Sequence, residues 1–109
     1  MIVILESPFA GKKPADTKAN KSYARRCMRD SLLRGEAPMV SHLLYTQAGV
    51  LDDEVPAERK MGIKAGHAWL RVARKSVVYM DRGVSHGMSI GIEAANKLGV
   101  QIEYRFLDK

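Results

Sequence analysis

The chain has 109 residues, of which 46% are hydrophobic and 28% charged, and its formal net charge is +6. This length is typical of one folded domain, so we expect a single domain over residues 1–109. The one cysteine, Cys27, excludes an internal disulfide and a zinc site built on cysteines. No apolar run is long enough to span a bilayer, and residues 1–11 lack the basic segment of a signal peptide. We therefore expect a cytoplasmic protein without a membrane partner.

The first half of the chain begins with an apolar run at residues 1–5, which predicts a buried parallel strand. A turn-rich loop follows at 6–11, and the polar residues 12–20 are expected to be mobile. Apolar residues at helical spacing predict a helix over 21–34, with Gly35 just past its end. Residues 39–45 form another apolar run, which predicts the second strand.

The second half of the chain continues the alternation. Pro56 suits the first turn of a helix, and Gly62 and Gly66 in that helix would let a neighbouring element approach closely. A third strand is predicted at 76–80 and a helix at 88–98, with Ser85 as N-cap and Gly99 past its end. Alternating residues at 101–107 predict an edge strand. The inward stripe of the middle helix is predicted to consist of Met61, Ala65, Ala68, Trp69 and Val72.

This order of elements predicts an α/β fold with a mostly parallel sheet of four to five strands and helices on both faces. The positive charge is concentrated between Lys12 and Arg34, where only Asp16 and Asp30 are acidic. Such a segment attracts polyanions or phosphates, or it is a solvated helix face. Proteins that bind nucleic acid interleave aromatic residues for stacking, and this segment contains only Tyr23. We interpret it as a solvated face and expect no nucleic-acid partner.

A ligand site is expected where the strands end, because ligands of open α/β sheets bind at the carboxyl edge. The start of the last helix supplies free N–H groups for an anion, Phe9 can stack on a base, and Asp81 can accept hydrogen bonds from ribose hydroxyls. Each residue also has a plain structural role, such as capping, core packing or tying a loop. The candidate ligand-binding residues are Ser7, Pro8, Phe9, Ala10, Gly11, Asp81, Gly83, Ser85, His86, Gly87 and Met88.

Motifs for cofactors and metals are absent from the sequence. It contains no GxGxxG fingerprint, no Walker loop and no nucleophile elbow. His42, His67 and His86 share no metal-ligand spacing. We interpret His42 as a buried, hydrogen-bonded histidine and His86 as the histidine that contacts a ligand. No cofactor and no metal are expected.

Three segments carry a resemblance to a known family. They are the Ser7–Gly11 sequence SPFAG after the first strand, Asp81 after the third, and the helix start Gly87-Met88-Ser89-Ile90-Gly91, with Gly99 in agreement. Over nearly its full length the chain resembles nucleoside 2-deoxyribosyltransferases and the wider SLOG group of nucleotide-binding domains, in particular small phage and bacterial proteins. The resemblance implies a three-layer, Rossmann-like or flavodoxin-like domain.

The resemblance also identifies the position of the catalytic carboxylate. In the transferases, a glutamate at the helix start attacks the anomeric carbon of the sugar, and the matching residue here is Ser89. A second acidic position matches Gly83. Glu6 and Glu93 are the candidate replacement carboxylates, and Ser89 joins the ligand-binding candidates. The resemblance therefore implies a retained pocket without its main catalytic group.

Three functions follow from these expectations. The first is binding or sequestration of a nucleotide or ADP-ribose-like molecule. If the protein comes from a phage, it would act in the host cytoplasm and counter immunity that uses nucleotide signals. The alternative is a nucleoside or nucleotide N-glycosidase, or a deoxyribosyltransferase-type enzyme, using Glu6, Glu93 or Asp81. A third is a subunit without a ligand. A homo-oligomer is expected under each, with the surface of Gly62 and Gly66, Trp69 and the last helix as candidate contacts.

Overall fold

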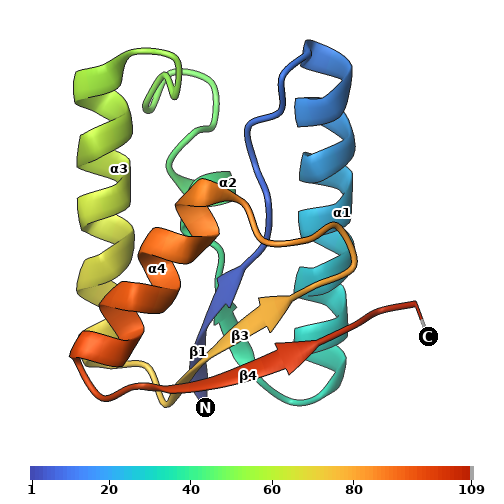
Figure 1. The fold of residues 1–109 in the computed structure, drawn as a ribbon, viewed down its shortest axis with the longest axis vertical. Coiled ribbons are helices and arrows are strands. Elements are labelled where there is room, and N and C mark those ends of the chain that lie inside the picture. Colours follow the sequence, from blue (N-terminus) through green and yellow to red (C-terminus); the bar gives the residue numbers. More distant parts are fainter. Residues whose placement is uncertain (109) are drawn as a thin grey trace.

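Four parallel strands form one sheet in the order β2-β1-β3-β4 (Figure 1). The structure is a computed structural model that describes residues 1–108. The strands are β1 (Ile2–Glu6), β2 (Ala37–Met39), β3 (Lys75–Tyr79) and β4 (Gln101–Arg105). Val3 lies opposite Lys75, which lies opposite Gln101, so the register continues across the sheet. The predicted parallel sheet is confirmed, with four strands.

Helices cover both faces of this sheet, as predicted (Figure 1). They are α1 (Pro14–Leu33), α2 (Ser41–Leu44), α3 (Pro56–Ala68), which continues into the 3-10 turn η1 (Trp69–Arg71), and α4 (His86–Lys97). On one face, Tyr23 and Cys27 of α1 pack against β1 and β3. On the other face, Leu70 and Ala95 pack around Ile4. No helix within residues 1–108 is long and apolar enough to cross a membrane.

Two predictions about the first half of the chain are wrong. Residues 14–20, expected to be mobile, form the first turns of α1, where the Asn20 amide donates to the Phe9 carbonyl at 3.0 Å. The strand predicted at 39–45 is instead β2, which ends at Met39, followed by α2. A short apolar run fits a buried strand and a buried helix equally well. Here Leu43 contributes to the core from a helix.

The predicted inward stripe is wrong at Met61 and Val72, whereas Trp69 packs against the core as expected. Met61 is 58% exposed and Val72 is 60% exposed, whereas Gly66 and Leu70 are buried. The reason is the close contact between α2 and α3. A Cβ at Gly66 would lie 2.5 Å from Ser41 Oγ, so only glycine fits there. The close approach expected at Gly66 is therefore made by α2 of the same chain.

The helix ends were predicted more accurately. Ser85 Oγ accepts a hydrogen bond from the Met88 amide at 3.2 Å, which confirms it as the N-cap of α4. Gly35 and Gly99 both adopt positive φ, +85° and +70°, directly after helices. The last strand ends at Arg105, two residues earlier than predicted, because the Leu107 amide donates to Asp81.

A network of charged residues fills the α1 face near β4. Arg105 is 5% exposed and binds Glu36, which precedes β2, with an N–O distance of 2.5 Å. Lys75 pairs with Glu36 and with Glu103, at 3.5 and 2.7 Å. The Tyr79 hydroxyl donates to Asp30 of α1 at 2.7 Å. The network therefore connects all the layers on this side of the sheet.

Candidate functional site

A cavity of about 210 Å³ lies at the carboxyl end of β1, where the sequence predicted a site. It is enclosed by the end of β1, by α2 and α3, and by the start of α4. It adjoins a wider groove of about 980 Å³ beside the 46–54 loop. Phe9, Ala10, Asp53 and Arg59 line both spaces, so the two spaces border each other at these residues.

Glu6 and Asp53 both line the cavity, and Asp53 is paired with Arg59. The Glu6 side chain lies against α4 at Gly91, where a Cβ would be 2.7 Å from Glu6 Cδ and closer still to one carboxyl oxygen. Within residues 1–108 this carboxyl makes no hydrogen bond and no ion pair. Burial raises the pKa of Glu6 to about 8, because the charged form loses its hydration without gaining a partner. At neutral pH the group is mainly an uncharged acid.

Ser7 and His42 form a polar pair on the same wall. Ser7 Oγ lies 3.1 Å from His42 Nε2, and Ser7 is 5% exposed. Burial lowers the pKa of His42 to about 4, so the ring is neutral at pH 7. The Phe9 ring packs edge-on against the imidazole with centroids 5.4 Å apart. The interpretation of His42 as a buried, hydrogen-bonded histidine is consistent with this geometry, although it lies in a helix and not in a strand.

The start of α4 closes the cavity through Ser85, His86 and Gly87. Met88, by contrast, is 2% exposed and belongs to the core, with its sulfur accepting from the Ser85 amide at 3.4 Å. Ser89 is exposed and does not line the cavity. The predicted segment therefore contributes its first three residues to the cavity wall.

Asp81 and Glu93 lie outside the cavity. Asp81 accepts from the Tyr23 hydroxyl at 2.6 Å and from the amides of Leu107 and Asp108. Burial opposes ionisation of Asp81, but these hydrogen bonds outweigh it and hold its pKa below the ordinary value. The Glu93 side chain is 68% exposed and pairs with Lys97 at 3.3 Å. Pro8 and Gly83 also lie outside the cavity, and Gly11 lines only the groove.

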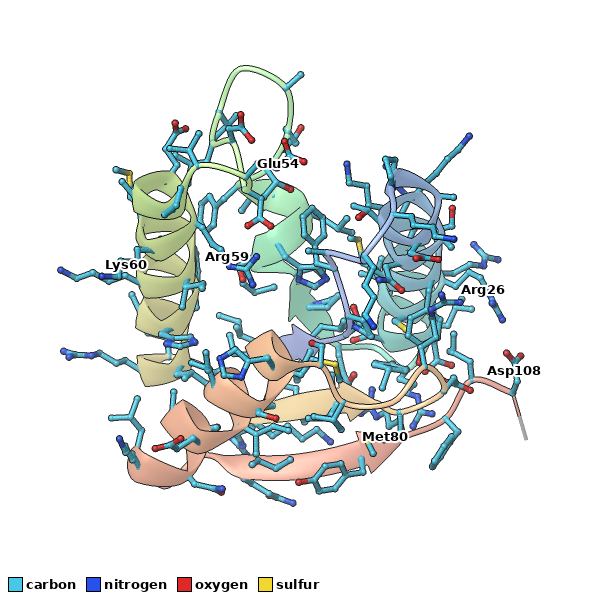
Figure 2. All side chains as sticks on the ribbon, turned by 45° about the horizontal axis from the view of Figure 1, so that its top comes forward. Arg26, Glu54, Arg59, Lys60, Met80 and Asp108 are labelled. Atoms are coloured by element: carbon cyan, nitrogen blue, oxygen red, sulfur yellow. The ribbon has the colours of Figure 1, made fainter. Side chains whose placement is uncertain are left out.

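Residues of α2 and α3 complete the site and were not predicted. Arg59 and His67 come from α3, Ser41 from α2, and Asp53 from the loop before α3. Arg59 Nη1 pairs with Asp53 at 3.3 Å. In Figure 2, Arg59 points from α3 towards α2, whereas Lys60 points away from the molecule. Gly66 was the one residue in the sequence that indicated this part of the site, since it lies at the contact between α2 and α3.

A protein-family model described as a domain of unknown function, DUF7768, matches residues 1–105. The chain belongs to the DUF7768 family. A search of curated proteins gives no match.

This DUF7768 chain is also similar to a solved structure of a 2-deoxyribosyltransferase from Bacillus psychrosaccharolyticus. The TM-score is 0.66 at 17% sequence identity, over 97% of this chain and 72% of that one. That enzyme is described as a biocatalyst for the synthesis of antiviral and antitumoral nucleosides. At this identity the likeness establishes the fold. The Rossmann-like architecture implied by the resemblance is thereby confirmed.

Proposed function

We propose that this DUF7768 protein binds a nucleotide or an ADP-ribose-like molecule, with a pentose in the cavity and the remainder in the groove. The observation that carries the proposal is that the two spaces adjoin and share lining residues, Phe9 and Arg59 among them. Sites that enclose a whole drug-sized ligand measure roughly 300–1,000 Å³. A cavity of about 210 Å³ is below that range and suits a sugar, whereas the groove of about 980 Å³ has room for a base and phosphates.

The side chains of the two spaces support this division. The cavity offers a carboxyl, the Ser7–His42 pair and the start of α4, all of which can hydrogen bond to sugar hydroxyls. The groove offers an aromatic ring at Phe9, with the Lys21 amine 5.4 Å from its centroid. The remaining predicted residues, Pro8, Gly11, Asp81, Gly83, Met88 and Ser89, stay proposed ligand residues on the strength of the resemblance.

Binding to immobilised or free protein tests the proposal directly. We expect saturable binding of adenosine 5′-monophosphate or ADP-ribose by calorimetry, with the ligand recovered intact after denaturation. Arg59→Gln should weaken binding, and Lys60→Gln, an exposed neighbour on the same helix, should not. Absence of binding across a nucleoside and nucleotide panel would refute the proposal. A protein that binds its ligand without cleaving it acts by sequestration. On the basis of the resemblance, we propose that this is a cytoplasmic phage protein that withholds a nucleotide signal from host immunity.

Cleavage of the N-glycosidic bond is the second candidate function. It is favoured by one observation, the unpartnered Glu6 carboxyl in the cavity. Ser89, at the position of the family nucleophile, is exposed and outside the cavity, which favours binding over covalent transfer. Release of free base from a nucleoside 5′-monophosphate, lost in Glu6→Gln, would identify an enzyme. Recovery of intact ligand after prolonged incubation would eliminate this candidate.

A homo-oligomer is also part of the proposal, but its expected contacts change. Gly66 is covered by Ser41, and Trp69 Nε1 donates to the Tyr45 hydroxyl at 2.9 Å, so both serve packing within the chain. The exposed side of α4 is the candidate that is left. Light scattering that reports a monomer would exclude an oligomer.

A further inference from the structure

Glu6 is the group in this molecule whose position is hardest to explain by packing alone. It ends the central strand β1, its side chain is half-buried, and its carboxyl lies beside α4 without a hydrogen bond or ion pair in residues 1–108. Removing a carboxyl from water without giving it a partner costs stability. The carboxylate of Glu36, whose side chain is 7% exposed, is by contrast bound by Arg105 and by Ser31. Glu6 is therefore present at a cost to stability that Glu36 avoids.

The opposing helix is shaped to receive this carboxyl. Gly91 is buried in α4, and any side chain there would collide with both carboxyl oxygens of Glu6. Glycine in the interior of a helix weakens it by roughly 1 kcal/mol relative to alanine. Two unfavourable features, a half-buried acid on β1 and a glycine inside helix α4, thus lie against each other. Glu6 lines the proposed sugar cavity, whereas Gly91 is not among the lining residues.

The surroundings determine the form in which Glu6 can act. The titratable and charged groups that share its cavity are His42 of α2, Asp53, Arg59 and His67 around α3, and His86 of α4. None of the cations among them forms an ion pair with Glu6. Burial is the cause of its raised pKa, and no neighbouring charge offsets it. An uncharged carboxyl has one O–H donor and one carbonyl acceptor, the pair that matches a sugar hydroxyl.

We propose that Glu6 is the ligand-contacting carboxyl of this site, and that it donates a hydrogen bond as a neutral acid to an oxygen of the bound sugar. This inference rests on the proposed function. It adds the residue that recognises the sugar, the form in which it does so, and the role of Gly91 as the position that makes room for it. Binding consequently depends on pH through Glu6.

The test measures the dissociation constants of adenosine 5′-monophosphate and ADP-ribose between pH 6 and pH 10. For the wild type we expect constant affinity up to about pH 8 and a loss above it. Glu6→Leu should bind roughly tenfold more weakly at pH 7, the effect of one lost hydrogen bond. Glu6→Gln keeps a donor, so it should bind at pH 7 and lose the dependence on pH. Asp108→Asn, at a carboxylate whose side chain is 70% exposed, is the matched control and should behave as wild type.

Gly91→Ala provides a second route to the same answer. The added methyl occupies the place of the carboxyl, so this variant should bind more weakly while Glu6 itself is retained. Wild-type binding that is unchanged in Glu6→Leu and independent of pH would overturn the role of Glu6 and leave the proposed function standing. Failure of the wild type to bind either probe would overturn both.

Discussion

At the scale of single residues, the cavity is lined by three groups whose ionisation is suppressed by burial, namely Glu6, His42 and His67. Glu6 has a raised pKa of about 8 and His42 a lowered pKa of about 4. Glu6 and His42 are uncharged near neutral pH, and the charged residues Asp53 and Arg59 of the same wall pair with each other. Uncharged hydrogen-bonding groups suit a neutral sugar better than a phosphate. The groove is lined by the cationic side chains Lys21 and Arg59 and by the acidic residues Asp52, Asp53, Glu54 and Glu58, and Arg59 lines the cavity as well.

Glu6 makes a specific contribution to the dependence of stability on pH. Its folded pKa lies above its unfolded value of 4.5, so the folded state binds more protons and stability falls as pH rises from about 4.5 to about 8. We expect Glu6→Gln to exceed the wild type in free energy of unfolding by on the order of 2–4 kcal/mol at pH 9. At pH 4 the two proteins should be nearly equal. Urea denaturation at both pH values measures this, and equal stability at pH 9 would contradict it.

At the scale of elements, the contact between α2 and α3 forms one wall of the site. Gly66 and Ser41 meet so closely that a methyl group cannot be inserted. We expect Gly66→Ala to lower the free energy of unfolding by about 1–3 kcal/mol, although alanine favours helix. Gly87→Ala, where an added Cβ meets nothing within 4 Å, is the matched control and should be neutral or slightly stabilising. Thermal and urea unfolding compare the two.

A second substitution that removes the Ser41 side chain tests whether the contact between Ser41 and Gly66 causes this loss of stability. Ser41 Cβ would lie 2.9 Å from the new methyl, so both atoms of the serine side chain contribute to the collision. Ser41→Gly should therefore restore much of the stability that Gly66→Ala loses. Additive losses in the double variant would show that the two helices do not meet as described.

The start of α4 allows a simpler prediction. Ser85 Oγ accepts from the Met88 amide, which would otherwise lack a partner. Ser85→Ala should cost about 1 kcal/mol in the free energy of unfolding, the typical value of an N-cap. Ser22→Ala, at an exposed position of α1, should change stability little. A Ser85→Ala variant with wild-type stability would argue against the cap.

The success of prediction from sequence differed between elements for physical reasons. α4 was located closely because Ser85 and Gly99 have strong local preferences at helix ends. The region of α2 was misread because an apolar run of this length does not distinguish a helix from a strand. With α2 misplaced, the contacts of Arg59 and His67 could not be foreseen. These residues approach β1 only through the packing of α2 on α3.

Part of the site could therefore be predicted from the sequence, and part could not. The strand-end loop after β1 and the start of α4 follow from the rule that parallel strands end at one edge. Asp81 also follows a strand, but its carboxylate accepts hydrogen bonds from the Leu107 and Asp108 amides. These residues are far away along the chain, so the local sequence does not predict the contact. The role proposed for Glu6 depends on its contact with Gly91. The two residues are 85 positions apart in the sequence, so only the structure shows this contact.

At the scale of the whole molecule, the buried ion network connects the segment before β2 with the end of β4. Bonds from Arg105 lower the pKa of Glu36 to about 2. Its contribution to stability is therefore complete above about pH 4.5 and is lost as pH falls towards 2. We expect Glu36→Gln to be about 1.5–3 kcal/mol less stable at pH 7, since buried Arg105 loses one of its two carboxylates and keeps only Glu103 and the Tyr79 hydroxyl. Chemical denaturation at pH 7 and pH 3 should show this difference shrinking in acid.

The double variant Glu36→Leu with Arg105→Met separates pairing from packing. Replacement of a buried ion pair by apolar residues of similar volume is often neutral, so this variant should recover stability relative to Glu36→Gln. If it is instead the least stable of the three, the remaining members Lys75 and Glu103 depend on the missing pair. Wild-type stability of Glu36→Gln at pH 7 would contradict the network itself.

The parallel sheet also determines the order of events when the chain folds. All three strand pairings are parallel, so none can start from a local hairpin. Each pairing closes a loop that contains a helix, and β1, the first strand made, acquires its partner β3 only after residue 75 has been synthesised. Sheets of this kind fold slowly because the entropy cost of closing each loop comes before the stabilising contacts between the strands form. Until β3 has been synthesised, β1 can pair only with β2, and its other edge stays without a partner.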